Sequence, residues 1–585
     1  MNFSAVFHRT SDNYCYPLNE EEMVINLKTG YDVKRVFLHF ADPFAAGILG
    51  SEEAWSGEKK EIAEVKKLPE HLWWTARVEP EFKRVKYFFE LSDGENTWFY
   101  FEDGFYTEDQ LQLEGRRWQC FIFPWMNRAD INRTPGWVKD TVWYQIFPDR
   151  FCNGDPAINR EDIRPWKSEP SRNEYHYGGD LAGIISKLDY LVELGINGIY
   201  LNPIFLAGST HKYDTTDYKK IDPEFGDNET FRLLVDEAHK RRIRIMIDGV
   251  FNHCGRSFGP WKDVLENGPE SPYYDWFMIN KWPFDQTEMD TRDGKFYSFA
   301  FTSGMPKFNT NNEEVIEYLL DICRYWVKEY DVDGLRLDVA NEFSHRFAKR
   351  LLESMMQIKP DIYILGEIWH DSIRWLQGDE FHAVMNYPLT SAISDYWLDS
   401  SMDREDLEKR LEYCYTLYME QSNDVMFNLL DSHDTERLIY RTKDEDIFFQ
   451  QLAMLFTMQG TPCIYYGTEI ILEGAQDPDC RRCMPWREIE EGLYRESIDT
   501  MKQLIHLRRT YGACKSRKIW YTNTIQGGRV VEYVKEDREG NRIQVILSAG
   551  DTLYDIPKAG EILFSRNYSD NTLMPKGILI RKYDN

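Results

Sequence analysis

The residues best suited to chemistry lie in a short segment near the middle of the chain, Gly334–Asp338, which reads GLRLD. Arg336 and Asp338 are two positions apart, so on a β-strand their side chains project to the same side. An arginine beside an aspartate is expected to lower the pKa of that carboxyl group and keep it ionised, as a carboxylate nucleophile requires. A buried structural ion pair would show the same pattern, and for this segment alone it is the more common explanation.

Further acidic residues follow other short apolar runs. Glu367 and Asp434 each end such a run, and Asp248 lies in a third one. If these runs are strands of one parallel barrel, their carboxyl ends converge on one pocket, where barrel enzymes place their chemistry. A divalent-metal site is the alternative. A His-x-His pair on the first strand would favour metal, and Tyr144–Phe147 contains none.

Several carboxylates that meet without a metal pair are typical of glycoside hydrolysis. One carboxylate attacks the anomeric carbon and one carboxylic acid protonates the leaving oxygen, and in a retaining enzyme the two stand about 5 Å apart. Neighbouring strands would give Asp338 and Glu367 a compatible separation. We expect Asp338 to be the nucleophile. Glu367 is followed by the apolar Ile368 and Trp369, a setting that suits a general acid. Asp434 would stabilise positive charge on the sugar ring.

The elements that must position these residues alternate between short apolar strands and helical patterns. This alternation predicts βα units, and eight of them predict an α/β fold of the (β/α)8 TIM-barrel type rather than a doubly wound sheet. The stretch from Phe251 to about Asn312 is too long for an ordinary loop and predicts an inserted rim domain after strand 3. The expected strands are Thr141–Phe147, Gly198–Pro203, Arg244–Val250, Gly334–Val339, Ile362–Ile368, Ala383–Tyr387, Phe427–Asp431 and Pro462–Tyr466.

Both ends of the chain predict β domains. Arg84–Leu91 and Thr97–Phe101 are rich in β-forming residues and are joined by a hairpin-type loop. Near the other end, Val530–Val534 and Ile543–Leu547 alternate with turns. The predicted domains are an N-terminal β-sandwich at 1–125, the barrel at 126–508 with its insertion at about 251–312, and a C-terminal antiparallel β-sandwich at 509–585.

Composition excludes several classes of partner. The chain has 98 Asp and Glu against 70 Lys and Arg, a formal net charge of −28, which argues against nucleic acid and against an anionic membrane surface. No run approaches the length of a transmembrane helix, and the first residues lack a signal-peptide pattern. The ten cysteines are scattered, and the lone pair Cys480 and Cys483 has no partner pair at zinc spacing. We therefore expect a cytoplasmic protein with reduced thiols.

Four segments resemble, in the right order, the sequence regions of the α-amylase clan, glycoside hydrolase family 13: Asp248–His253, Gly334–Glu342, Gly366–Trp369 and Leu430–Asp434. The resemblance implies the roles given above for the three carboxylates. It also implies that Tyr213 stacks on the sugar at subsite −1. The other substrate-binding residues that we expect are His253, Arg336, Trp369, His433, Asp477 and Arg481.

Finer marks indicate a subgroup. Met305–Asn309 and Val339–Glu342 resemble the MPKLN and VANE segments of the neopullulanase, cyclomaltodextrinase and maltogenic amylase group. The resemblance implies hydrolysis of cyclodextrins, maltooligosaccharides and pullulan. A transglycosylase of the same fold is an alternative, and so is a non-enzymatic glucan-binding protein, although such proteins usually lose the carboxylates that are present here.

The same resemblance concerns the N-terminal domain and the assembly. Residues 1–125 resemble the starch-binding-like module of the subgroup, which packs over the barrel of a partner subunit, so we expect a homodimer. The module should then expose aromatic side chains toward the partner's site. The residues expected to be exposed include Trp73, Trp74, Trp98 and Trp118.

Calcium is the one cofactor that the resemblance suggests. Glu342 stands where many α-amylases have a histidine whose carbonyl helps bind a shared calcium, and this departure argues against that ion here. A different calcium loop, seen in some members of the subgroup, is resembled by the Asn-Gly-Asp and Gly-Gly-Asp segments at 153–155 and 178–180. Oxygen ligands suit calcium, while an Asn-Gly turn with solvated acids would explain the pattern equally well. The expected ligands are Asn153, Asp155, Asn159, Gly178 and Asp180.

Overall fold

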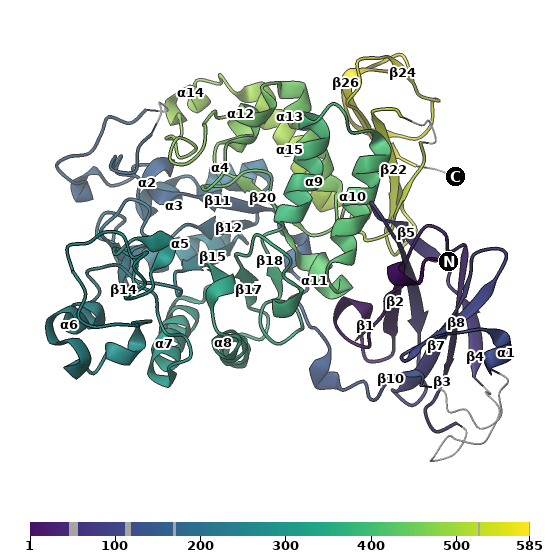
Figure 1. Ribbon diagram of the computed structural model, residues 1–585. Helices are drawn as coiled ribbons and strands as arrows, with labels where there is room; N and C mark the ends of the chain where they lie inside the picture. Colours follow the sequence, from purple (N-terminus) through teal and green to yellow (C-terminus); the bar gives the residue numbers. More distant parts are fainter. Residues whose placement is uncertain (46–56, 112–118, 168–170, 524–526, 584–585) are drawn as a thin grey trace. The chain divides into compact units, whose positions relative to one another are not determined.

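The computed structural model describes residues 1–585 except 46–56, 112–118, 168–170, 524–526 and 584–585 (Figure 1). The described residues form two compact units. The first unit holds Met1–Arg133, Asp371–Asp379 and Ser401–Asn423, and the second holds Thr134–His370, Glu380–Ser400 and Asp424–Asn585. Two short segments from within the predicted barrel range thus belong to the N-terminal unit.

The second unit is built around eight parallel strands, counted over the described residues, in the order β18-β17-β16-β15-β12-β11-β20-β19. A parallel bridge between Met385 and Phe427 joins the two outer strands and closes the sheet into a barrel. The prediction of a (β/α)8 barrel is confirmed. The strands are β11 (Trp143–Ile146), β12 (Gly198–Leu201), β15 (Arg244–Gly249), β16 (Gly334–Leu337), β17 (Tyr363–Gly366), β18 (Ala383–Val384), β19 (Phe427–Asn428) and β20 (Thr461–Tyr465).

Helices begin where the sequence supplies a side chain that caps them. Asp227, Asn312 and Ser344 each accept a hydrogen bond from a backbone N–H of the first turn that follows. The helical stretch predicted at 181–194 is two helices, because the chain leaves helical geometry at Lys187. The longer helices are α3 (Leu181–Ser186), α4 (Leu188–Leu194), α5 (Asn228–Lys240), α7 (Glu313–Tyr330), α8 (His345–Ile358), α9 (Tyr387–Leu398), α13 (Glu445–Thr457) and α15 (Arg495–Thr510).

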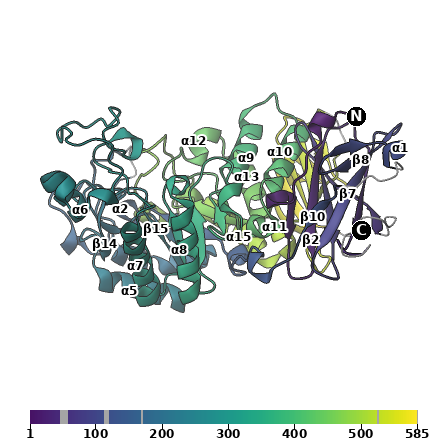
Figure 2. The same cartoon turned by 60° about the horizontal axis from the view of Figure 1, so that its bottom comes forward.

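The outside of the barrel is covered by these helices. Each buries an apolar stripe and leaves its charged residues in water, as α7 does with Val315, Leu319 and Trp326 on its buried side. Helices α5, α7 and α8 lie side by side next to β15 and its neighbours (Figures 1 and 2). None of the helices in the described part of the chain is both long and apolar enough to span a membrane.

The long connection between β15 and α7 has an aromatic core of its own. Trp261, on α6 (Gly259–Asn267), packs against Phe277 and Phe296. Isolated backbone bridges such as His253 to Lys307 tie this region to the end of β15. A two-stranded sheet, β13 (Phe205–Ala207) and β14 (Thr215–Ile221), stands on the other side of β15 in sequence and carries Tyr213 in its connecting loop.

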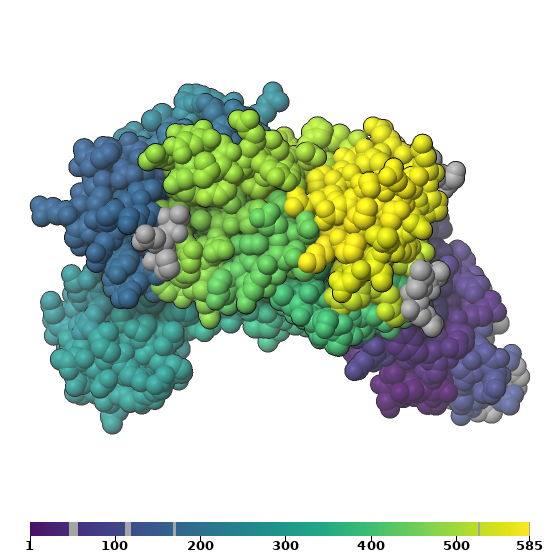
Figure 3. Space-filling view, turned by 90° about the horizontal axis from the view of Figure 1, so that it is seen from above, coloured from purple at the N-terminus to yellow at the C-terminus, as the bar shows by residue number. Residues whose placement is uncertain are grey.

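The C-terminal strands form one antiparallel sheet over the described residues, rather than the two sheets of the predicted sandwich. It lies against α13 and α15, and the space-filling view shows this sheet in yellow beside the yellow-green helices (Figure 3). The strands are β21 (Ile519–Tyr521), β22 (Val530–Glu536), β23 (Arg542–Ser548), β24 (Tyr554–Asp555), β25 (Ile562–Ser569) and β26 (Thr572–Lys582).

The N-terminal unit consists of two antiparallel sheets, with strand orders β1-β2-β6-β5 and β4-β3-β7-β8-β9, and its apolar core is drawn from both. Trp73 and Trp74 are buried, so the expectation that they are exposed is wrong. The strand that carries them is covered on both faces, and the Trp74 indole donates to Thr29. Trp98 is half-buried, and Trp118 lies outside the described residues. The strands are β1 (Cys15–Pro17), β2 (Met23–Thr29), β3 (Arg35–Ala41), β4 (Glu58–Glu61), β5 (Glu64–Lys67), β6 (Leu72–Val78), β7 (Val85–Ser92), β8 (Thr97–Phe101), β9 (Gly104–Tyr106) and β10 (Phe121–Phe123).

Candidate active site

A cavity of about 400 Å³ lies at the carboxyl ends of the barrel strands. The residues predicted from the sequence converge here, because the loops that follow β15, β16, β17 and β19 all meet at this end. Arg336 and His433 lie beneath the lining, fully buried, and contact residues of the wall. The lining comprises Asn173, His211, Tyr213, His253, Phe299, Met305, Asp338, Val339, Asn341, Glu367, Trp369, Asp434, Asp477 and Arg481.

Arg336 connects the acidic residues of the cavity. Its Nη1 donates to Asp338 Oδ1 at 2.9 Å and to the two oxygens of Asp248 at 2.9 and 3.0 Å. Its Nη2 lies 2.9 Å from Glu367 Oε2, at an angle that makes this an ion pair rather than a hydrogen bond. A planar guanidinium can face several carboxylates at once. The expected nucleophile and the expected acid are therefore held beside one fixed cation.

Two donors fix the orientation of Glu367. The backbone N–H of Val339 donates to Oε2 at 3.0 Å, and the Trp369 indole donates to Oε1 at 3.1 Å. Val339 has a φ of 48°, a left-handed conformation that is rare for a β-branched residue and that persists where the surroundings require it. Trp369 stacks on Tyr387 with ring centroids 3.7 Å apart. Half of the Trp369 surface, 51%, stays exposed and can accept a sugar face.

Burial changes the ionisation of the carboxyl groups. It raises the pKa of Asp338 well above its ordinary value, and the charge of Glu367 adds to this, while Arg336 opposes it. Burial and Glu367 likewise raise the pKa of Asp434 to about 7. The expectation that Arg336 lowers the pKa of Asp338 is wrong, because the same guanidinium also serves Asp248 and Glu367 and cannot neutralise them all. The acidic residues therefore share protons as one group.

His433 is held as a neutral donor by a residue that the sequence analysis missed. Gln145 Nε2, from β11, lies 2.7 Å from His433 Nδ1, and its contact with Asn202 Oδ1 at 3.0 Å agrees with this amide orientation. Because Nδ1 accepts, the proton of the ring is on Nε2. Burial, with Arg481 and Arg336, lowers the pKa of His433 well below its ordinary value. A polar amide inside the apolar run of β11 was the available signal.

The protonated Nε2 of His433 faces the cavity wall. It lies 2.6 Å from Tyr213 Oη and 3.0 Å from Asp434 Oδ2. Tyr213 Oη in turn donates to Asp248 Oδ2 at 3.1 Å and accepts from Asn202 Nδ2 at 3.1 Å. The Tyr213 ring is therefore fixed, parallel to His433 with centroids 5.5 Å apart, as a stacking surface for a sugar requires.

Two further predicted residues have polar atoms available at the cavity. His253 stacks on Phe299 at 4.9 Å, and its buried Nε2 has no partner in the described part of the chain. Burial lowers the pKa of His253 to about 3, so the ring is neutral. Arg481 Nη2 lies 2.9 Å from Asp477 and 3.3 Å from Asp434. The loop pair at 477 and 481 thus reaches the predicted stabilising carboxylate.

A lysine occupies the place beside Glu342. Lys307 Nζ lies 2.6 Å from the Glu342 carboxylate and 3.4 Å from its carbonyl oxygen, and it donates to Asn252 Oδ1. An ammonium group among these oxygens competes with a divalent cation for the same ligands. This contact, which joins the inserted region to the end of β16, gives a physical reason for the departure at Glu342.

The second predicted calcium loop has an oxygen available. Asn153 Oδ1 is buried without a partner among the described residues, next to Asn159 Oδ1 and the backbone of Gly178, which has a φ of 80°. Asp180 behaves differently from the expected ligand. Its Oδ1 caps α3 and its Oδ2 accepts the backbone N–H groups at Gly154 and Asp155. No cluster of three or more His, Cys, Asp or Glu in the described ranges could hold a metal, so a calcium here would rely on amide and carbonyl oxygens.

The model of the α-amylase catalytic domain matches residues 145–518, and that of the α-amylase N-terminal Ig-like domain matches residues 1–127. The chain belongs to the α-amylase family. It is 43% identical to a cyclomaltodextrinase of Geobacillus thermopakistaniensis over 95% of this chain and 93% of that protein. It is 44% identical to the intracellular maltogenic amylase of Bacillus subtilis over 87% and 84%. A solved cyclomaltodextrinase, 36% identical, superposes with a TM-score of 0.88 and covers 100% of this chain and 98% of its own.

Membership of the α-amylase family makes the chain a glycoside hydrolase, as the carboxylates predicted. The resemblance on which the prediction relied is confirmed, including its subgroup. The individual roles of Asp338, Glu367 and Asp434, and those of the substrate-binding residues, stay predictions that the geometry above makes specific.

Proposed function

We propose that this enzyme hydrolyses α-1,4-glucosidic bonds in cyclodextrins, maltooligosaccharides and pullulan, with retention of the anomeric configuration. The observation that carries the proposal is the pair Asp338 and Glu367, on adjacent strands, facing one cavity and contacting one guanidinium. This is the arrangement that a double displacement needs, since both groups must reach the same glycosidic bond.

In the proposed mechanism an Asp338 carboxylate oxygen attacks the anomeric carbon while the bond to the leaving oxygen breaks. Glu367 gives its proton to that oxygen, which departs as a hydroxyl group. A water molecule then attacks the same carbon, Glu367 takes one proton from it, and Asp338 leaves as a carboxylate. Asp434 and the Nε2–H of His433 lie where they can hold the ring as positive charge develops.

Substrate choice follows from the size and lining of the cavity. About 400 Å³ admits one or a few glucosyl units, and the ring of Trp369 offers a flat apolar face at the mouth. A cyclodextrin presents curved apolar surface to such a ring. We therefore place compact rings and short chains ahead of branched starch.

The proposal is tested by measuring initial rates on β-cyclodextrin, pullulan and soluble starch side by side. We expect the highest kcat/KM on β-cyclodextrin. A faster rate on starch would contradict the substrate order, and no release of reducing ends from any of the three would contradict the function. Product analysis at high maltotriose separates hydrolysis from transfer, because transfer yields longer oligosaccharides.

We also propose that the enzyme acts inside the cell as a homodimer. A similar Bacillus subtilis enzyme is named intracellular. The N-terminal unit exposes Phe44 and Phe82 on either side of Arg84, an apolar surface that a partner subunit could cover. Sedimentation equilibrium should give twice the chain mass of 69.5 kDa. A monomer at micromolar concentration would overturn the dimer.

Calcium is proposed as a structural ion only. Asn153, Asn159 and the Gly178 backbone supply oxygens, with Asp155 beside them, and the partnerless oxygen of Asn153 supports the proposal. A bound calcium would give this turn a fixed charge and hold the loop in place. Asp180, whose oxygens are used by backbone N–H groups, would contribute by shaping the turn.

A further inference from the structure

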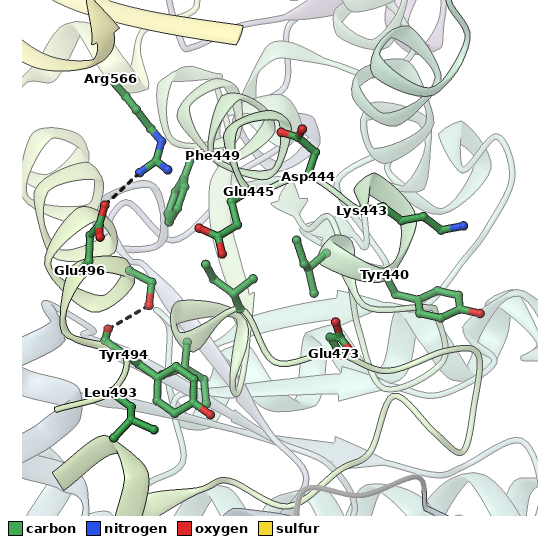
Figure 4. Close-up of a pocket in the computed structure, with 14 residues that line it drawn as sticks. Tyr440, Lys443, Asp444, Glu445, Phe449, Glu473, Leu493, Tyr494, Glu496 and Arg566 are labelled. Atoms are coloured by element: carbon green, nitrogen blue, oxygen red, sulfur yellow. Dashed lines mark hydrogen bonds and ion pairs between the residues drawn. The ribbon is translucent and has the colours of Figure 1, made fainter. Parts of the chain in front are cut away.

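A second hollow, of about 750 Å³, shares none of its lining residues with the catalytic cavity (Figure 4). Its walls come from α12 (Leu438–Thr442), the start of α13, the chain around 470–473, the turn before α15, and β25. The lining comprises Ile439, Tyr440, Lys443, Asp444, Glu445, Phe449, Ile470, Ile471, Glu473, Leu493, Tyr494, Glu496, Ser497 and Arg566.

Flat and apolar surfaces face this hollow although nothing in the described chain covers them. Figure 4 shows the rings of Tyr440 and Tyr494 on two sides of it, with Glu473 between them. Tyr440 is 42% exposed and Leu493 is 65% exposed. Exposed rings and a large exposed leucine around one hollow mark a binding surface more often than scattered surface residues do.

The polar groups in the hollow fall into two sets. Asp444 and Arg566 serve the fold, since Asp444 caps α13 and pairs with Lys576 at 2.6 Å, and Arg566 pairs with Asp446 at 2.7 Å. Lys443, Glu445 and Glu473 have neither a hydrogen bond nor an ion pair from their side chains within the described residues. The second set is therefore available to a ligand.

The backbone of the hollow adds a second sign. Ile471 has a φ of 57° and Lys443 a φ of 51°, both left-handed. This conformation is disfavoured for a β-branched residue such as Ile471, and such conformations cluster at ligand sites. Both residues line the hollow, so the unfavourable geometry contributes to its shape.

The charge balance narrows the ligand. Carboxylates outnumber cations among the lining residues, so an anion such as phosphate is disfavoured. The described residues hold no metal-binding cluster of acidic, histidine or cysteine side chains. The ligand that fits is neutral, with many hydroxyl groups and flat apolar faces, and a volume in the range of about 300 to 1,000 Å³ is usual for such sites. We propose that this hollow is a second binding site for a short segment of α-glucan, an inference that rests on the proposed function.

Chain connections link this site to the catalytic cavity. The helix that carries Tyr440 begins shortly after Asp434, and Glu473 leads into the loop of Asp477. Between them the fully buried Arg437 donates from its backbone N–H to Gly474 O at 3.0 Å and from Nε to the Cys480 carbonyl at 2.8 Å. A glucan held in the hollow would stay close to the enzyme between cleavage events. The gain should therefore be greater for long chains than for a small ring.

The test uses the full chain with Asp338→Asn, so that ligand is not consumed, and calorimetric titration with maltoheptaose. We expect two binding events. The double substitution Tyr440→Ala with Tyr494→Ala should weaken one of them about tenfold or more, as loss of aromatic anchors does. Trp369→Ala should weaken the other. Tyr413→Ala removes a tyrosine of similar exposure, 46%, outside the hollow, and should change neither.

A second variant guards against misfolding of the first. Leu493→Glu changes the most exposed wall residue, adds a carboxylate to the hollow, and should weaken the same event as the tyrosine pair. In the otherwise native enzyme these variants should raise KM for soluble starch while kcat/KM on β-cyclodextrin stays within twofold. A single event in the Asp338→Asn protein, or a second event that neither set of substitutions weakens, overturns the site. Failure of the proposed function would appear separately, as absence of hydrolysis by the wild-type enzyme.

Discussion

The two hollows of the barrel unit contain similar side chains in opposite settings. In the catalytic cavity Asp338 and Glu367 are buried and contact a buried arginine, and the pKa of Asp338 is raised. In the second hollow Glu445 and Glu473 are exposed and have no partner among the described residues. The larger of the two is not the reactive one. Buried charges are costly unless compensated, so burial and compensation distinguish chemistry from binding better than volume does.

The largest effect should come from the nucleophile. Asp338→Asn should lower kcat on β-cyclodextrin by about 10³-fold or more, because the covalent step is lost. Binding of maltotriose should be retained. Glu58→Gln, at an exposed carboxylate of the N-terminal unit, serves as the matched control and should leave kcat unchanged. Activity of Asp338→Asn within tenfold of wild type would remove Asp338 from the mechanism and erase the contrast between the two hollows.

The next effect concerns the buried partner of His433. Gln145→Leu conserves volume but removes the donor to Nδ1, so the proton of His433 is no longer confined to Nε2. We expect kcat/KM to fall about tenfold to a hundredfold, in line with about 1–3 kcal/mol for an unpaired buried polar atom. Nitrogen NMR of labelled histidine should show the change of tautomer. A variant with full activity and an unchanged His433 signal would show that Gln145 is only a packing residue.

The pH profile should differ from that of an ordinary carboxylate pair. Asp434 must be ionised to stabilise positive charge, and a carboxyl group is ionised only above its pKa. Because the pKa of Asp434 is raised to about 7, activity should fall as the pH drops through this range. Arg481 lowers that pKa, so Arg481→Met should move the acid limb to higher pH. An acid limb that stays near 4 in both proteins would contradict the burial argument.

The alkaline limb reports on the acid. Glu367 must be protonated for the first step, so kcat/KM should fall again at high pH and the profile should be bell-shaped. With an aryl glycoside whose leaving group needs no proton, Glu367→Gln should retain glycosylation and lose the alkaline limb. A limb that persists in this variant would mean that another group is the acid.

The smallest effect should be that of calcium. Added to metal-free protein, calcium should raise the melting temperature by about 2 °C or more, since an ion that binds only the folded state stabilises it by mass action. Turnover should not change. Asn153→Ala should abolish the shift, and an unchanged melting curve for the wild type would leave 153–159 a simple turn. Lys307→Met should not create the shift, because it removes a cation without adding an oxygen ligand.

Local patterns were sufficient to predict the barrel and its strand ends. The apolar runs became strands that are shorter than predicted, because Asp338 and Glu367 follow the last paired residue rather than ending the strand. The motif order brought the predicted carboxylates to one cavity. Both successes depend on residues close together in sequence, where periodicity and spacing carry information.

The failures concern contacts between distant residues. Gln145 and His433 are 288 positions apart, and Lys307 meets Glu342 across the inserted region, so no local pattern indicates either contact. The direction of the Asp338 pKa shift was wrong because the spacing of Arg336 and Asp338 does not reveal the other carboxylates that share the guanidinium. Trp74 was misjudged because composition does not show which faces of a strand are covered.

The most direct test of the central claim is to trap the intermediate. The protein with Glu367→Gln is mixed with α-maltosyl fluoride, whose leaving group needs no acid, and the digested product is analysed by mass spectrometry. The account predicts one maltosyl group on the peptide that contains Asp338, absent when Asp338→Asn is combined with Glu367→Gln. A maltosyl adduct on another residue, or turnover with inversion and no adduct, would contradict it.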